Sequence, residues 1–104
     1  MQLYSFFRSG TSHRVRIALN LKGLAAQYMA VDLRTEAHQS AEYKALNPQG
    51  LVPALVKDGK VMTQSPAIIE WLEETHPTPA LLPTTPDDRA RVRALAALVA
   101  CDIH

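Results

Sequence analysis

The sequence of 104 residues has little cysteine, few aromatic residues and no long apolar run. Cys101 is its single cysteine, so the chain cannot close an internal disulfide and has no Cys-x-x-Cys pair for thiol exchange or zinc binding. No apolar run approaches the roughly eighteen residues of a membrane span, and the N-terminus lacks the pattern of a secretory signal. These absences predict a soluble, cytoplasmic protein with no membrane segment.

Charge is low overall and unevenly placed. The formal net charge of +1 argues against a nucleic-acid partner. Residues 1–31 carry four basic side chains and no acidic one, whereas all ten acidic residues follow residue 31. The four histidines lie far apart in the sequence, and this spacing predicts no metal centre. If the protein binds an anion, the N-terminal part is where we expect it.

That basic part centres on the stretch RSGTSHRVR at residues 8–16, between an apolar run and an amphipathic run. A loop that leads from a strand into a helix gathers unpaired backbone N–H groups and a partial positive charge. The hydroxyls of Ser9, Thr11 and Ser12 can donate hydrogen bonds to an anion such as a thiolate. Alternatively, one of them only caps the helix. The stretch by itself leaves both interpretations open.

Hydrophobic periodicity predicts seven elements in the order β-α-β-α-β-β-α. Strands are expected at residues 2–7, 27–33, 51–56 and 61–64, and helices at about 12–22, at 37–46 and from Ser65 onward. Gly23 ends the first helix, and Asp58-Gly59 predicts a hairpin between the last two strands. A parallel first pair of strands and this hairpin make a mixed four-stranded sheet, which indicates an α/β protein of the thioredoxin-like fold.

The helix that starts at Ser65 is expected to have Ser65 as its N-cap and Pro66 as its first residue. Its apolar side chains should face the core and its three glutamates the solvent; these are Ile68, Ile69 and Leu72, and Glu70, Glu73 and Glu74.

The last quarter of the sequence predicts a domain boundary. Residues 75–86 hold four prolines and read as a linker. Thr85-Pro86 then opens a further helix, which reaches towards Ile103 with no stop signal and carries an apolar stripe. We therefore expect one domain at residues 1–80, and at residues 81–104 a linker and the start of an all-helical C-terminal domain that is cut short.

Four ordered motifs resemble the zeta class of glutathione transferases: YSFFRSGTSHRVRIALNLKG, ALNPQGLVPALV, QSPAIIEWLEETHPTPALLP and DDRARVRALAALVACDIH. Together they cover essentially the whole chain. The class contains the glutathione-dependent maleylacetoacetate and maleylpyruvate isomerases. Its members commonly carry Ser-Ser-Cys and then Ser-Trp in the first loop, whereas this sequence has SGTSH at residues 9–13, a variant similar to the bacterial maleylpyruvate isomerases.

The resemblance implies that the thiol of glutathione lies at the first loop. Ser9 is the first choice as hydrogen-bond donor to the thiolate, and Thr11 is the second. Gly10 would let the backbone approach the sulfur. Arg8 would bind a carboxylate of the substrate, or it is an ordinary surface arginine.

Other positions are implied to bind the rest of glutathione. Val52-Pro53 resembles a cis-proline turn that presents the Val52 backbone to the cysteinyl unit, the alternative being a trans bond at a strand start. Gln64 and Ser65 resemble the clamp for the γ-glutamyl carboxylate, and Ser65 can cap a helix as well. The remaining implied contacts are His38, which by itself reads as an ordinary surface residue, and a segment that acts in part across a homodimer: Asp102, Ile103 and His104.

The function that the resemblance implies is cis–trans isomerisation of a small keto-dicarboxylic acid, maleylpyruvate or maleylacetoacetate, in the breakdown of aromatic compounds. Glutathione would be the cofactor, through transient addition of its thiolate. Two alternatives stay open: a transferase or dehalogenase that acts on small electrophiles, and a non-catalytic glutathione-binding module. The presence of Ser9, Val52, Gln64 and Ser65 together argues against the module.

Overall fold

Four short strands form one mixed sheet in a computed structural model, which describes residues 1–6, 9–31 and 40–103. The strands are β1 (Gln2–Ser5), β2 (Gln27–Ala30), β3 (Ala54–Lys57) and β4 (Lys60–Thr63), and their order in the sheet is β2-β1-β3-β4. Strand β1 runs parallel to β2 and antiparallel to β3, and β3 pairs antiparallel with β4. The predicted α/β class and mixed four-stranded sheet are therefore confirmed.

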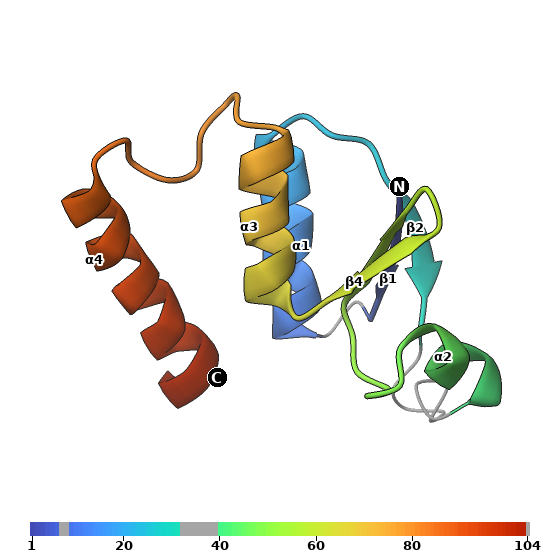
Figure 1. The fold of residues 1–104 in the computed structure, drawn as a ribbon. Helices are drawn as coiled ribbons and strands as arrows, with labels where there is room; N and C mark the ends of the chain where they lie inside the picture. The colour runs from blue at the N-terminus through green and yellow to red at the C-terminus, as the bar shows by residue number, and fades with distance from the viewer. Residues whose placement is uncertain (7–8, 32–39, 104) are drawn as a thin grey trace.

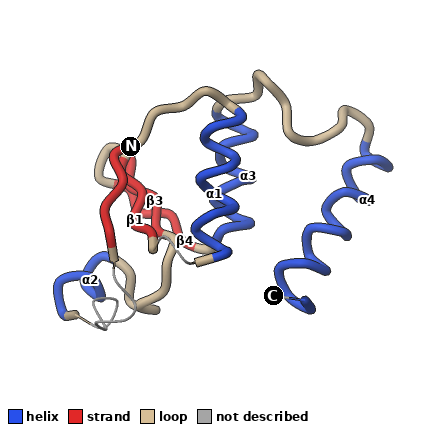
Figure 2. Tube along the Cα trace, turned by 180° about the vertical axis from the view of Figure 1, so that it is seen from behind, coloured by secondary structure: helices blue, strands red, loops and turns tan. Residues whose placement is uncertain are grey.

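Helices α1 (Gly10–Leu21) and α3 (Ser65–Thr75) lie side by side against one face of the sheet. Helix α2 (Ala41–Leu46) packs on the other face, near the end of the strands where α1 and α3 begin (Figure 1). Helix α4 (Pro86–Ala97) continues into the π-helical turn η3 (Leu98–Ile103) and is joined to α3 by an irregular segment (Figure 2). Both α1 and α3 start at the same end of the pair. Their N-termini are therefore neighbours.

The core is divided by the sheet because successive strand residues point to opposite faces. Leu3 and Leu55 face α1 and α3, where Val15, Leu19 and Ile68 are completely buried. The alternate residues of the same strands pack on the other face against α2 and the segments beside it; this second cluster comprises Tyr4, Val31, Tyr43, Leu46, Val52 and Ala54. This two-sided packing holds the ends of α1 and α3 at fixed places relative to β3.

Local signals account for most element ends. Gly23 has a φ of 67° directly after the α1 C-cap, and Asp58 and Gly59 have φ values of 51° and 77°, as a two-residue hairpin requires. Three elements start two to four residues away from the expected position, whereas β4 is shifted by one residue. Helix α2 starts at Ala41 rather than residue 37 because Ser40 caps it, its Oγ accepting from Tyr43 N at 3.1 Å.

Strand β3 starts at Ala54 rather than residue 51. The carbonyl of Leu51 accepts hydrogen bonds from the side chains of Tyr43 and Asn47 instead of pairing in the sheet, and Pro53 has no N–H to donate. The helix expected from residue 12 starts at Gly10 because Ser9 is its N-cap. The described part of β1 ends at Ser5 and that of β2 at Ala30, while residues 7, 32, 33 and 37–39 lie outside the described residues.

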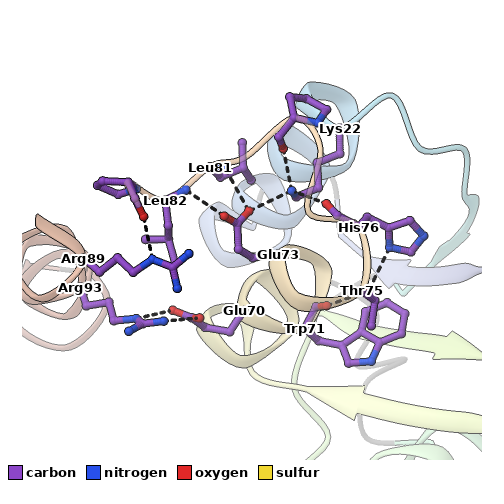
Figure 3. Close-up of polar contacts among 12 residues, drawn as sticks. Lys22, Glu70, Trp71, Glu73, Thr75, His76, Leu81, Leu82, Arg89 and Arg93 are labelled. Carbon is purple, nitrogen blue, oxygen red and sulfur yellow. Dashed lines mark hydrogen bonds and ion pairs between the residues drawn. The ribbon is translucent and has the colours of Figure 1, made fainter. Parts of the chain in front are cut away.

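The prediction that Glu73 faces solvent was wrong. Glu73 is buried, and its carboxylate pairs with the Lys22 ammonium at 2.9 Å; the side chains are 10% and 0% exposed (Figure 3). The same carboxylate accepts hydrogen bonds from the backbone N–H groups of Leu81 and Leu82. A polar side chain is stable there because each of its oxygen atoms has a donor.

Helix α4 packs much less closely than the rest of the chain. Thr85 caps it as expected, its Oγ1 accepting from Asp88 N, but none of the residues 86–97 is buried. Leu95, Leu98 and Val99 expose 61%, 45% and 44% of their surface. Several apolar side chains of α4 and η3 are therefore largely uncovered. Within the described residues, no helix is long and apolar enough to cross a membrane.

Candidate functional site

A cleft of about 370 Å³ opens where α1 and α3 begin. Six residues predicted for the site line it together: Ser9, Thr11, Val52, Pro53, Gln64 and Ser65. They come from three segments that are up to 56 positions apart in the sequence, and the sheet brings them to one place. The cleft has the size of an ordinary small-ligand site.

The first wall of the cleft is the N-terminus of α1. Ser9 is the N-cap, and its Oγ accepts a hydrogen bond from Ser12 N at 3.2 Å. The same Oγ lies 2.9 Å from Thr11 Oγ1, which in turn donates to the carbonyl oxygen of Val52 at 3.1 Å. Ser9 thus caps the helix and faces the cleft as well, so the two interpretations of this hydroxyl are compatible.

Two neighbouring residues of the first loop are not among those that line the cleft. Gly10 is the exposed first residue of α1 and is not among the residues that line the cleft. Ser12 is fully buried, and its Oγ has no hydrogen-bond partner among the described residues. Of the three hydroxyls proposed for this loop, only those of Ser9 and Thr11 are therefore placed to meet a ligand.

The second wall is the N-terminus of α3. Ser65 was expected to be the N-cap, but Gln64 takes that position with a φ of 70°, and Ser65 is the first helical residue. The N–H of a first helical residue has no partner within its helix. Pro66 follows and has no N–H, so Ser65 and Ala67 supply the free N–H donors of the first turn.

The third wall is the segment that links α2 to β3, and here the Val52–Pro53 peptide bond is cis, as predicted. Asn47 organises this segment: its Nδ2 donates to Leu51 O at 2.7 Å and its Oδ1 accepts from Gln49 N at 3.2 Å. Tyr43 also donates to Leu51 O, and burial raises the pKa of Tyr43 while its hydrogen bond with Asn47 opposes that rise.

Sequence reasoning missed five residues of the cleft: Asn47, Gln49, Gly50, Leu51 and Thr63. Asn47 comes directly after the helix expected at residues 37–46. Its side chain is only 2% exposed, and its hydrogen bonds shape the loop before Pro53. Gln49 Oε1 accepts from Gln64 Nε2 at 2.9 Å. The side chain of Gln64, which was expected to bind the γ-glutamyl carboxylate, is therefore hydrogen-bonded to a residue on another wall of the cleft.

Every residue that the structure describes in the lining is uncharged. A bound anion would therefore depend on backbone N–H groups, hydroxyls and the N-terminal ends of two helices. Neither α1 nor α3 has an acidic residue in its first turn to cancel that partial positive charge. The geometry favours a ligand with a peptide backbone and anionic groups.

Several predicted site residues cannot be placed. Arg8, His38 and His104 lie outside the described residues. Asp102 and Ile103 belong to the turn η3, but their side chains are not part of what the structure describes. Their proposed contacts stay predictions.

A second cavity of about 400 Å³ lies between α3 and α4 and shares Ser65 with the cleft. Its lining is mainly apolar: Pro66, Ile69, Leu81, Leu82, Val92, Ala96, Val99 and Ala100. Arg14, Glu70, Glu73 and Arg93 also border it, and Arg93 is paired with Glu70 at 3.1 Å (Figure 3). A group bound at Ser65 would thus lie next to this mainly apolar cavity.

The fold defines a thioredoxin-like domain with a cleft beside its first loop. The family model described as the glutathione S-transferase N-terminal domain matches residues 8–75. The chain therefore belongs to the glutathione S-transferase N-terminal domain family, and its thioredoxin-like fold is that of the family.

Similar proteins give the same classification. The chain is 66% identical over all 104 residues to a maleylpyruvate isomerase of Ralstonia sp, of which it covers 49%. It matches a holo structure of a zeta-class maleylpyruvate isomerase with a TM-score of 0.97 at 66% identity, over 100% of this chain and 49% of that one.

A maleylacetoacetate isomerase of Methylobacterium extorquens, solved with malonate and glutathione, matches with a TM-score of 0.95 at 48% identity, over 98% of this chain and 48% of that one. The chain thus spans about half the length of the relatives that it matches.

Proposed function

We propose that this cleft binds glutathione and serves a glutathione-dependent isomerase that converts maleylpyruvate or maleylacetoacetate to its fumaryl isomer. The observation that carries the proposal is the convergence of Ser9, Val52 and Ser65 on one cleft at two helix N-termini. The 66% identity to a maleylpyruvate isomerase and the glutathione held by a related isomerase support it.

The residues present fit glutathione. The Ser65 hydroxyl and the N–H groups of the α3 first turn suit the γ-glutamyl carboxylate, and Gln64 stands beside them. The backbone of Val52 suits the cysteinyl unit, in the manner of a short added strand. Ser9, at the α1 N-terminus, suits the sulfur as a hydrogen-bond donor. His38, Asp102, Ile103 and His104 complete the proposed binding set.

The chain's own groups would make the thiolate accessible at neutral pH. A hydroxyl hydrogen bond and a helix N-terminus both stabilise the charged sulfur over the neutral thiol. Bound glutathione supplies a nucleophile whose reversible addition turns the substrate double bond into a single bond that can rotate. Arg8 is the cation that we assign to a carboxylate of the keto-dicarboxylic substrate.

The proposal extends to the organisation of the protein. Residues 1–80 form the glutathione-binding domain, and residues 81–104 form a linker and the first helix of an all-helical domain. The uncovered apolar side chains of α4, such as Leu95, are consistent with that arrangement. A homodimer and a location in the cytoplasm, where glutathione is kept as the thiol, belong to the same proposal.

The test is the loss of ultraviolet absorbance of maleylpyruvate, and separately of maleylacetoacetate, with and without glutathione. It compares this chain with a chimera continued past His104 by the second half of the Ralstonia relative. Isomerisation that requires glutathione, by either protein, supports the proposal. Glutathione binding without isomerisation of either substrate by either protein would favour a transferase that acts on other electrophiles.

A further inference from the structure

Three hydrogen bonds at the N-terminus of α1 allow only one arrangement of the hydroxyl hydrogen atoms. Thr11 donates to Val52 O at 3.1 Å, since a carbonyl oxygen cannot donate. A threonine hydroxyl has a single hydrogen. In its 2.9 Å contact with Ser9 Oγ, Thr11 is therefore the acceptor and Ser9 is the donor. Ser9 Oγ also accepts from Ser12 N.

It follows that the one hydrogen of the Ser9 hydroxyl is committed to Thr11. Ser9 can donate to a ligand in the cleft and keep its 2.9 Å hydrogen bond with Thr11 only if Thr11 turns its own hydrogen towards Ser9. That rotation removes the donor from the Val52 carbonyl. Because a buried or half-buried carbonyl without a donor costs free energy, the rotation requires a new donor at Val52 O. The N–H of a peptide paired with the Val52 backbone is such a donor.

We propose that Thr11 is a positioning residue that couples occupation of the Val52 carbonyl to the direction of the Ser9 hydroxyl. With the cleft empty, hydrogens point from Ser9 to Thr11 and from Thr11 to Val52. With a peptide N–H on Val52, they point from Thr11 to Ser9 and from Ser9 into the cleft. This inference rests on the proposed function, because the peptide is glutathione and the group that Ser9 then meets is its thiolate.

The coupling discriminates between ligands. When a thiolate binds without a peptide N–H at Val52 O, the Ser9 hydroxyl still donates to Thr11. When glutathione binds, its cysteinyl N–H pairs with Val52 O, and the Ser9 hydroxyl turns towards the sulfur. One hydrogen bond to a charged group accounts for roughly a tenfold change in the thiolate-to-thiol ratio of the bound ligand at fixed pH. Removal of the Thr11 hydroxyl should abolish the discrimination, because Ser9 then has no competing acceptor.

The experiment compares two ligands, glutathione and its depsipeptide analogue, in which an ester oxygen replaces the cysteinyl N–H. The thiolate of each bound ligand is measured by ultraviolet absorbance at fixed pH. A sample saturated with S-methylglutathione is subtracted, so that Cys101 and the tyrosines cancel. The proteins are the wild type, Thr11→Val, which keeps the side-chain shape, and Thr11→Ser, which keeps the hydroxyl. Thermal unfolding of each variant shows that it is folded.

We expect the wild type and Thr11→Ser to lose about tenfold in the thiolate-to-thiol ratio on passing from glutathione to the depsipeptide. In Thr11→Val the ratio should be the same for the two ligands, even though the depsipeptide binds more weakly to all three proteins. An equal loss in wild type and Thr11→Val, or no loss in the wild type, overturns the coupling while glutathione binding stands. Failure of the wild type to bind either glutathione or S-methylglutathione refutes the proposed function itself.

Discussion

The pair formed by Lys22 and Glu73 makes the strongest prediction about stability. Lys22 Nζ donates to Glu73 Oε1 at 2.9 Å and also to the carbonyl oxygens of His76 and Pro79, at 2.6 and 2.8 Å (Figure 3). Glu73 accepts from Leu81 N at 2.9 Å and from Leu82 N at 3.1 Å. The two side chains thus join the end of α1, the α3 helix and the segment that leads to α4.

The substitution Glu73→Ala would leave the buried ammonium of Lys22 without a counter-charge and would remove the acceptors of two backbone N–H groups. Loss of one partner of a buried ion pair costs about 3–5 kcal/mol. A chain of this length has a free energy of unfolding of about 5–15 kcal/mol. The midpoint of thermal unfolding should therefore fall by more than about 10 °C.

Thermal and urea unfolding followed by circular dichroism measure the effect. Lys22→Met, Glu73→Leu and the double variant Lys22→Met with Glu73→Leu complete a double-mutant cycle with the wild type. The double variant should be more stable than Glu73→Ala, because no unpaired charge remains buried. A loss below about 1 kcal/mol for Glu73→Ala, typical of an exposed pair, would refute the reasoning.

Further predictions concern charge and ligand binding. Burial raises the pKa of Glu73, but the hydrogen bonds from Lys22 and from two backbone N–H groups outweigh this effect and lower the pKa below its ordinary value of 4.5. The contribution of Glu73 to the free energy of unfolding should therefore be complete above that value and be lost as pH falls through the lower pKa of the folded state. Urea unfolding at a series of pH values should show this loss in the wild type and not in Glu73→Gln. Arg93→Met should leave the midpoint of thermal unfolding unchanged, since Arg93 and Glu70 are 51% and 37% exposed. Ser9→Ala should reduce turnover far more than glutathione affinity, and equal losses in steady-state kinetics and calorimetry would contradict a role at the sulfur. Ser65→Ala should weaken glutathione binding in calorimetry, and an unchanged affinity would remove its proposed contact with the carboxylate.

The order and type of the elements could be predicted because their signals are local. Gly23, Asp58-Gly59 and Thr85-Pro86 each mark a boundary through backbone conformation or capping, and the structure has these boundaries where expected. Ser40 is equally local, yet its cap at the start of α2 was overlooked in favour of apolar periodicity. The prediction of an element's boundary fails when a capping residue and the apolar periodicity indicate different start positions.

Hydrophobic periodicity could not predict contacts between residues that are far apart in the sequence. Glu73 follows the helical spacing of a solvent-facing residue, but Lys22, which neutralises it, lies 51 positions earlier. Asn47 likewise gives no sign in the sequence that it is buried and holds the loop before Pro53. The residues predicted for the cleft came from the family resemblance, and no pattern within this sequence alone would have brought Ser9, Val52 and Ser65 together.

The claim that this cleft is the glutathione site is tested most directly by nuclear magnetic resonance on the 104-residue chain. Glutathione is titrated into the ¹⁵N-labelled protein, and the shifts of the backbone amides are followed. The account predicts the largest changes at Ser9, Thr11, Val52, Gln64 and Ser65, and none at the Asp58-Gly59 turn on the far end of the hairpin. No saturable change, or changes centred away from the starts of α1 and α3, would contradict it.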